Sequence, residues 1–477
     1  MASMTIQNLS PNILQMEYAI QGPVVARAGE IEEELKKGVK KPFKNVIRAN
    51  IGDAQAMGQP PITFIRQMIA CIAYPKLIEE GNFPEDVRKR AKEFLQGCSG
   101  GTIGSYSIPH GLGHIRRRVA EYIEIRDGVP ADWKNVYLSA GATVAIQYCL
   151  QLFSDRSNGR KNGILTPVPT YPFYSACYSI FGINLVGYYL DEDSNWDTKI
   201  EELERSLVEA QNTCNVRALL VINPGNPTGQ VLSRKNIEEI IKFAYKHNLF
   251  IIADEVSQDN VYSGGKRFYS FRKVMIELGA PYSSIELVSF TSVSKGYMGE
   301  SGLRGGWLEL NNIQPDVQAQ LFKYISAMGT PNVIGQAVID CVVKPPSPGE
   351  PSYDLWLREK TAVLESLNAR ARLVSESLNA IEGYKCNVVQ GALYAFPRIN
   401  LPPKAIAAAE EANQLPDVFY AYRLLEETGI CVVPGSGFGQ VPGTYHYRTT
   451  ILPEYDQLRT ILETIRTFHQ RFIAQYT

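Results

Sequence analysis

The sequence lacks the features that mark secreted, membrane-spanning and nucleic-acid-binding proteins. No apolar run approaches the ~18 residues of a transmembrane helix. Residues 1–19 lack the basic segment and apolar core that begin a secretory signal. The 48 basic and 49 acidic residues nearly cancel, so the chain carries no excess positive charge for a nucleic acid. We therefore expect neither a membrane nor a nucleic acid as a partner.

Paired cysteines, metal-ligand clusters and targeting signals are also missing. The eight cysteines are scattered without a C-x-x-C motif, which predicts reduced, mostly buried thiols in an intracellular protein. His110 and His114 are four residues apart, but two glycines separate them and no third ligand is near, so we expect no metal site. The C-terminus is not a peroxisomal signal. We expect a cytoplasmic protein, with a mature mitochondrial form as the open alternative.

The length and the pattern of apolar residues predict a large α/β domain with additions at both ends. Between Val136 and about Cys341, short continuous apolar strands alternate with helical segments, which is typical of a mostly parallel, mixed sheet with helices on both faces. The Pro-rich residues 344–351 indicate a domain boundary, and residues 46–53 read as a short strand. We expect an N-terminal arm (1–45), an N-terminal part of a small domain with a linker (46–100), a large domain (101–345) and a C-terminal small α+β domain (346–477).

Residues 285–307 carry the strongest chemical signal. An apolar strand leads through hydroxyl residues to Lys295, and glycines then lead to Arg304. Desolvation at the end of a buried strand lowers the pKa of an ammonium group, and the neutral amine can form a Schiff base with a carbonyl. Ser292 and Arg304 are suited to hold a dianionic phosphate. Taken alone, Lys295 could equally be a solvated loop lysine.

Polar residues also follow other expected strands. Asn223 and Asp254 end apolar stretches, as Lys295 does, and ligands collect at the carboxyl ends of parallel strands. Two Asn-Pro pairs in residues 223–229 predict a rigid turn that presents an amide side chain to a cleft. A carboxylate at Asp254 needs a cationic partner, which a protonated pyridine nitrogen would provide. Residues 139–146 predict a strand end, a glycine turn and a helix start, which can bind an anion through free amides and the helix dipole. Taken alone, this stretch is more often an ordinary helix start.

Two short motifs of other enzymes are rejected. Gly97-x-Ser99-x-Gly101 matches the nucleophile elbow of α/β-hydrolases, but it follows the expected helix 85–96 rather than a strand. Ser292-x-x-Lys295 matches penicillin-recognising enzymes, but the S-D-N and K-T-G motifs of those enzymes are absent.

The order of the remaining motifs resembles that of fold type I pyridoxal-phosphate aminotransferases. The matching residues are 226–229 (Asn-Pro-Thr-Gly), Asp254, Ser292-x-Ser294-Lys295 and Arg304, and residues 50–53, 57–67, 294–300 and 304–306 are further similar to the alanine aminotransferases. The resemblance runs from about residue 45 to the C-terminus. It implies an α/β fold with a large cofactor-binding domain and a smaller domain, pyridoxal 5'-phosphate as cofactor, and a homodimer. The implied reaction converts L-alanine and 2-oxoglutarate to pyruvate and L-glutamate by a ping-pong cycle.

The resemblance also implies roles around the cofactor ring. Lys295 would form the Schiff base and move a proton during catalysis. Asp254 would pair with the pyridinium nitrogen, Asn226 would bond the 3' oxygen, and Tyr171 would stack on the ring.

Further implied roles concern the phosphate and the substrate. The phosphate would be held by Ala142, Thr143, Ser292, Ser294 and Arg304, with Tyr106 contributed across the dimer interface. Arg448 would clamp the α-carboxylate of the substrate through a bidentate pair, with Gly52 and Asn226 beside it.

One position departs from the family pattern. The pattern Asp-Glu-Val-Tyr-Gln reads Asp-Glu-Val-Ser-Gln here, so Ser257 replaces a tyrosine that would donate to the 3' oxygen of the cofactor. Serine reaches that place only through water, which leaves Asn226 alone or with help from Tyr262. Because a donor to the phenolate favours the deprotonated form, we expect a raised pKa of the Schiff base and weaker catalysis.

Three other functions share these motifs. A glutamate:glyoxylate aminotransferase has most of them, and a pyridoxal-phosphate lyase of the aminocyclopropane-carboxylate synthase type uses the same lysine and aspartate. A non-catalytic aminotransferase-like regulator would carry a DNA-binding domain before this fold, and we expect none in the first 45 residues.

Overall fold

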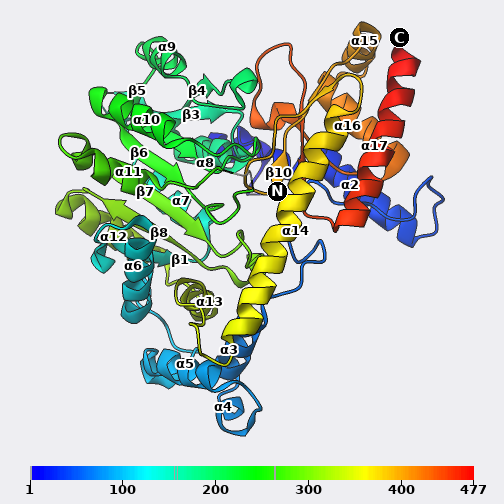
Figure 1. Cartoon of the computed structure of the whole chain (residues 1–477). Helices are drawn as coiled ribbons and strands as arrows, with labels where there is room; N and C mark the ends of the chain where they lie inside the picture. The colour runs from blue at the N-terminus through cyan, green and yellow to red at the C-terminus, as the bar shows by residue number, and fades with distance from the viewer. Residues whose placement is uncertain (1–2, 155, 158, 263–264) are drawn as a thin grey trace.

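A large mixed β-sheet forms the centre of the protein (Figure 1). The computed structural model describes residues 3–154, 156–157, 159–262 and 265–477. Within them the sheet has eight strands in the order β1-β8-β7-β6-β5-β3-β2, and β4 also pairs with β3. Strands β3 to β7 pair in parallel where they neighbour one another, whereas β1, β2 and β8 join antiparallel. The strands are β1 (Val136–Ser139), β2 (Arg156–Ser157), β3 (Arg160–Val168), β4 (Asn184–Tyr189), β5 (Asn215–Ile222), β6 (Phe250–Asp254), β7 (Leu287–Ser292) and β8 (Gly306–Asn311).

Helices cover both faces of this sheet, which explains why its strands are continuously apolar. Along β5, Leu219 and Val221 face a core with α9 (Ile200–Ala210), α10 (Arg234–Lys246) and α11 (Phe271–Leu278). The alternate residues Leu220 and Ile222 face a second core with α7 (Ala142–Gln151), α8 (Pro172–Phe181) and α12 (Pro315–Met328). Successive side chains of a strand point to opposite faces, so a strand with helices on both sides needs apolar residues at every position.

The residues after 345 form a separate group of elements beside the sheet. The long helix α14 (Tyr353–Asn379) follows the Pro-rich stretch and packs against α17 (Tyr455–Tyr476). With them lie α15 (Pro403–Glu411), α16 (Pro416–Thr428) and a three-stranded sheet in the order β10-β13-β12. These strands are β10 (Tyr394–Ala395), β12 (Val433–Pro434) and β13 (Tyr447–Thr450), and β9 (Tyr384–Lys385) pairs with β11 (Arg398–Ile399).

Some N-terminal residues pack against the elements after residue 345, and others pack against helices of the large sheet domain. Helix α2 (Pro23–Lys36) packs on α16, and Ile47 forms a single bridge with Ile430, so residues 46–53 are not the strand that the sequence predicted. Helix α3 (Thr63–Ala73) instead packs against α13 (Val333–Val343), which also contacts α6 (Gly113–Asp127). Helices α4 (Lys76–Glu80) and α5 (Glu85–Gln96) pack with α3 and with each other. The proposed domain boundaries stay a prediction.

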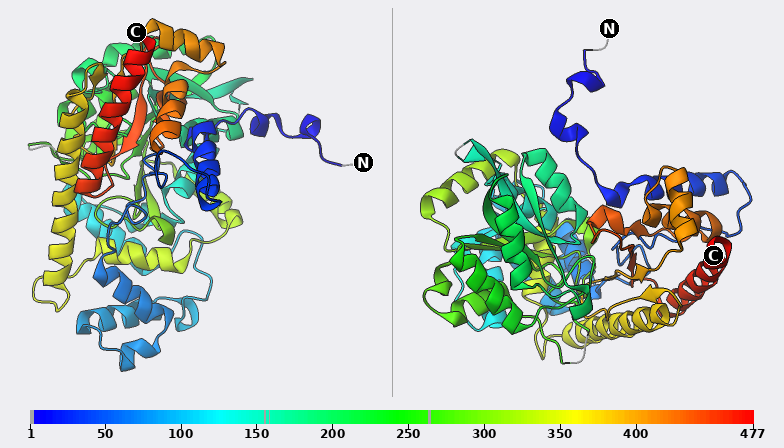
Figure 2. Two further views of the ribbon diagram at one scale, coloured as in Figure 1. Left: turned by 90° about the vertical axis from the view of Figure 1, so that its right-hand side faces the viewer. Right: turned by 90° about the horizontal axis from the view of Figure 1, so that it is seen from above.

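The first residues project from the body of the protein (Figure 2), and α1 (Pro11–Leu14) contacts α8, where Nδ2 of Asn12 donates to the backbone oxygen of Ile180 at 3.0 Å. This arm carries exposed apolar side chains, such as Met4, which is 71% exposed, and Ile13, which is 57% exposed. In the described part of the chain, no helix is long and apolar enough to cross a membrane, and no group of three or more potential ligands could hold a metal ion.

Candidate active site

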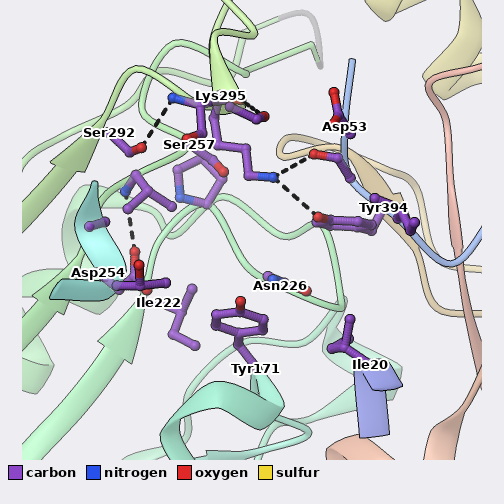
Figure 3. A pocket seen from close by; sticks show the side chains of 18 of the residues that line it. Ile20, Asp53, Tyr171, Ile222, Asn226, Asp254, Ser257, Ser292, Lys295 and Tyr394 are labelled. Carbon is purple, nitrogen blue, oxygen red and sulfur yellow. Dashed lines mark hydrogen bonds between the residues drawn. The ribbon is translucent and has the colours of Figure 1, made fainter. Parts of the chain in front are cut away.

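One cavity of about 290 Å³ collects the residues that the sequence singled out. It lies where β5, β6 and β7 end and where the group of elements after residue 345 meets the sheet. Every expected site residue except Tyr106 lines it. The strand ends are brought together by the parallel pairing of β5, β6 and β7, so that Asn226, Asp254 and Lys295 face a common space (Figure 3).

Lys295 follows β7 and points into this cavity. Its Nζ donates to the backbone oxygen of Gly52 at 2.8 Å and to the hydroxyl of Tyr394 at 3.4 Å (Figure 3). The space at this meeting point is full, because a Cβ on Gly52 would lie 1.8 Å from the Tyr394 hydroxyl and 3.0 Å from the amine. Residue 52 must therefore be glycine for these three groups to meet.

Asp254 ends β6 as a buried carboxylate that is 3% exposed. The hydroxyl of Tyr174, on α8, donates to its Oδ2 at 2.8 Å, and the backbone nitrogen of Val256 donates to Oδ1 at 3.3 Å. Burial raises the pKa of Asp254 from 3.8 to about 6, although these two donors and the charge of Lys295 act to lower it. No cation forms an ion pair with this carboxylate in the described residues, so it is suited to a cationic ligand group.

Arg448, on β13, forms the other polar end of the cavity and is 2% exposed. Its Nη1 donates to Oδ1 of Asn226 at 3.1 Å, and its Nη2 donates to the backbone oxygen of Asn50 at 2.7 Å. The guanidinium lies between two rings, 4.1 Å from the centre of Tyr394 and 4.9 Å from that of Phe438. Among the residues that the structure describes, Nε has no partner, and burial lowers the pKa of the group. A buried cation without a carboxylate partner is a site for an anionic ligand.

A third group of residues forms a cradle for an anion at the start of α7. Arg304 adopts a left-handed backbone conformation with φ of 54°, and its Nη2 donates to the hydroxyl of Thr143 at 3.2 Å. Gly141, with φ of 87°, gives the guanidinium room, since a Cβ there would lie 2.5 Å from Nη2. The Ser292 hydroxyl accepts from the backbone nitrogen of Ser294 at 3.1 Å. Hydroxyls, a guanidinium and free helix amides are the groups that bind phosphate.

Two aromatic positions have different surroundings. Tyr171 lines the cavity, and its hydroxyl is 3.4 Å from that of Tyr18. Tyr106 lies outside the cavity and is 91% exposed. A single chain does not test a contact between subunits, so the expected role of Tyr106 across a dimer interface stays a prediction.

The structure corrects one expectation about the replaced tyrosine. Ser257 lines the cavity, but Tyr262 does not, and it is buried in the core with its hydroxyl unpartnered. Its backbone nitrogen donates to the oxygen of Gln390 at 2.8 Å, which fixes this residue on the segment before β10. Tyr262 therefore cannot assist Asn226 from this position. Because Oδ1 of Asn226 accepts from Arg448, its Nδ2 is left to donate.

Three residues contact the site although the sequence did not predict them as site residues. Tyr394 touches Lys295 and Arg448, Tyr174 touches Asp254, and the backbone oxygen of Asn50 touches Arg448. Tyr174 is three residues after Tyr171, in the first turn of α8, and this short spacing to a predicted site residue was a usable signal. Tyr394 carried no such signal, since its contacts come from residues distant in sequence. Burial would raise the pKa of Tyr394, but the charges of Lys295 and Arg448 outweigh it and lower the pKa.

The donor set of this cavity fits pyridoxal 5'-phosphate. The anion cradle at Thr143 and Arg304 suits the phosphate, the unpaired carboxylate of Asp254 suits a pyridinium nitrogen, and Lys295 lies between them as the amine. The free Nδ2 of Asn226 suits an oxygen of the ring, and the aromatic face of Tyr171 suits the ring itself.

The comparison with known families places the chain in one of them. A model of the family described as aminotransferase class I and II matches residues 75–465. The chain belongs to this family, whose members use pyridoxal phosphate. Alanine aminotransferase 1 of Homo sapiens is 52% identical over 99% of this chain and 96% of that protein. Alanine aminotransferase 2 of Xenopus tropicalis is also 52% identical, over 99% of this chain and 91% of that protein.

Solved structures confirm the expected fold class. Alanine aminotransferase from Pyrococcus furiosus has a TM-score of 0.76 at 24% identity, covering 97% of this chain and 100% of that chain. Aspartate aminotransferase from Thermus thermophilus with maleate has a TM-score of 0.71 at 18% identity, covering 97% and 99%. At these identities the likeness concerns the fold alone.

Proposed function

We propose that this protein is an alanine aminotransferase, which converts L-alanine and 2-oxoglutarate to pyruvate and L-glutamate with pyridoxal 5'-phosphate. The observation that carries the proposal is the arrangement of Lys295, Asp254 and Arg448 around one cavity. The 52% identity to alanine aminotransferases over nearly the whole chain supports the choice of substrate. No observation favours the glyoxylate, lyase or regulator alternatives.

We expect some residues of the cavity to bind the cofactor and the substrate, and Lys295 to transfer protons. When bound, pyridoxal phosphate supplies a carbonyl that receives the amino group and a ring that withdraws electrons. Lys295 would accept a proton from the substrate Cα and deliver it to C4′ of the cofactor, and it would move a proton in the opposite direction in the second half-reaction. Asp254 would pair with the ring nitrogen, and its burial without an ion-pair partner in the described residues supports this role. Thr143, Ser292 and Arg304 hold the phosphate.

Arg448 would orient the amino acid. Its planar guanidinium matches a carboxylate with two parallel hydrogen bonds, and the two contacting rings keep the plane fixed. The α-carboxylate would replace part of the present bonding to the backbone of Asn50, next to Gly52. This positions the Cα of the substrate near the amine of Lys295.

We also propose a homodimer with shared active sites. The 91% exposure of Tyr106 and the apolar arm around Met4 and Ile13 support it, because both are costly to leave in water. Mixed dimers provide the test. If Tyr106 acts across the interface, a mixture of Tyr106→Phe and Lys295→Ala chains should contain one site with both native residues and regain activity. An equal lack of activity in the mixture would contradict sharing.

For the compartment we propose the cytoplasm, supported by the eight cysteines, which are all buried and free. The mitochondrion is the alternative, since a relative that is 46% identical over 99% of this chain is named "Probable alanine aminotransferase, mitochondrial" in Dictyostelium discoideum. Cell fractionation with antibody detection distinguishes the two.

The function is tested by separating its two half-reactions. The purified protein with pyridoxal phosphate should lose its yellow colour when L-alanine alone is added, with one pyruvate formed per active site. Addition of 2-oxoglutarate should then restore the colour and release glutamate. Glyoxylate in place of 2-oxoglutarate tests the nearest alternative acceptor, and Lys295→Ala is the inactive control. A yellow protein that forms no pyruvate from alanine would overturn the proposed substrate.

A further inference from the structure

Tyr394 occupies the position where the catalytic amine and the carboxylate clamp come closest together. It is on β10, which pairs with β13, and it lies opposite Thr450. Arg448 is two residues before Thr450, so both point to the same face of β13 and Tyr394 is a diagonal neighbour of Arg448. The ring thereby lies 4.1 Å from the guanidinium carbon, while the hydroxyl reaches Lys295 at 3.4 Å.

We propose that Tyr394 is a catalytic residue of this site with two separable parts. Its hydroxyl holds the amine of Lys295 for proton transfer at the substrate Cα. Its ring supports Arg448 in the plane that binds the substrate carboxylate. The inference rests on the proposed transamination and assigns the tyrosine a part in each half of that reaction.

The role of the hydroxyl follows from the crowding around Lys295. The amine has two oxygen partners, the carbonyl of Gly52 and the hydroxyl of Tyr394, and no space is left between them. A lysine side chain has four rotatable bonds, so an amine without such partners samples many positions. Proton transfer requires the amine within hydrogen-bonding reach of one carbon atom. The hydroxyl therefore limits the amine to the region where the substrate Cα would lie.

The role of the ring follows from the environment of Arg448. The guanidinium is buried, forms no ion pair in the described residues, and has an unpartnered Nε. Aromatic faces partly compensate a desolvated cation, and here Tyr394 is the nearer of two such faces. The ring thus stabilises Arg448 in a state that still has donors available for a carboxylate.

Two variants separate the parts. Tyr394→Phe removes only the hydroxyl, and we expect kcat for L-alanine to fall about tenfold with KM within about twofold of the original value. The kinetic isotope effect with Cα-deuterated alanine should increase, because proton transfer becomes more rate-limiting. Tyr394→Leu also removes the ring, and KM should then rise about tenfold in addition.

Binding of propionate to the cofactor-loaded, full-length protein provides a readout that is independent of turnover. Calorimetry should show unchanged affinity in Tyr394→Phe and about tenfold weaker affinity in Tyr394→Leu. Tyr188→Phe is the matched control, since it removes another buried hydroxyl, which donates to the backbone oxygen of Leu220 at 2.8 Å, and its kcat and isotope effect should be unchanged.

The outcomes that would overturn the roles of Tyr394 differ from the outcome that would overturn the proposed transamination. If the unmodified protein forms pyruvate from alanine, the function stands, and Tyr394 is then judged separately. An unchanged kcat and isotope effect in Tyr394→Phe would overturn the role of the hydroxyl. An unchanged propionate affinity in Tyr394→Leu would overturn the role of the ring, and Tyr394→Met replaces this variant if thermal unfolding shows that it is not folded.

Discussion

Replacing Asp254 by asparagine should stabilise the cofactor-free protein and impair its function. The carboxylate is buried, and burial raises its pKa from 3.8 to about 6. The folded state therefore resists ionisation of this group more than the unfolded state does. At about 1.4 kcal/mol per pH unit, the difference corresponds to about 3 kcal/mol of folding stability lost when the group is ionised. Asparagine has nearly the same shape, and its oxygen still accepts from Tyr174.

The size of this stabilisation, but not its sign, depends on pH. Below pH 3.8 the group is protonated in both states, so Asp254→Asn and the original protein should be equally stable. Between pH 3.8 and about 6 the unfolded state releases its proton first, and the cost of the carboxylate grows. Above about pH 6 the full advantage of asparagine should be present, at most about 3 kcal/mol.

The measurement is chemical unfolding of the cofactor-free protein at several pH values between 5 and 8, followed by tryptophan fluorescence. Asp456→Asn is a suitable control, because its carboxylate is 86% exposed and its pairing with Arg459 at the surface contributes little. Loss of the charge opposite the pyridinium should meanwhile lower kcat/KM about a hundredfold or more. Asp254→Asn that is less stable than the original protein at pH 8 would refute the reasoning, since burial would then not be the dominant cause.

Three further substitutions test the remaining parts of the site. Ser257→Tyr restores the family hydroxyl, so the pH at which the visible absorption of the cofactor-bound protein changes should fall and kcat should rise; an unchanged spectral titration would contradict the expected role. Arg448→Lys keeps the charge but loses the planar fork, so KM for L-alanine should rise about tenfold or more in steady-state assays, whereas an unaltered KM would exclude a bidentate clamp. Gly52→Ala places a methyl group 1.8 Å from the Tyr394 hydroxyl, so single-turnover pyruvate formation should slow at least about tenfold, and normal turnover would show that this region adapts.

The sequence predicted most of the large sheet and the polar residues at its strand ends that line the cavity, because these features depend on local patterns. Helix 85–96 was predicted with its observed bounds, and the strands before Asn223, Asp254 and Lys295 are present as expected. A strand that is buried on both faces must be apolar throughout, and the residues after its end are polar. An apolar run followed directly by polar residues can therefore be recognised within one short segment of the sequence. Asp254 and Lys295 then come together because parallel strands end at one edge.

The failures concern segments whose partners are distant in sequence. Residues 46–53 have the composition of a strand, but only Ile47 finds a bridging partner, at Ile430. Tyr262 is five residues after Ser257 and was a reasonable substitute, yet its backbone is held by Gln390 and its ring is in the core. Composition and periodicity describe one segment at a time, whereas pairing depends on which distant segment packs against it.

The sequence by itself determined the fold class and the family, and it predicted the candidate cofactor residues at the strand ends. Only the tertiary structure decided that Lys295 meets the backbone of Gly52 and the hydroxyl of Tyr394. It also decided that Arg448 lies against the ring of Tyr394 and reaches the backbone of Asn50. The physical reason is that these groups come from chain segments that are distant in sequence, since Gly52 lies 243 residues before Lys295 and Tyr394 lies 99 residues after it. Their approach is set by the packing of the C-terminal elements and the N-terminal segment against the sheet, to which every buried side chain at the junction contributes.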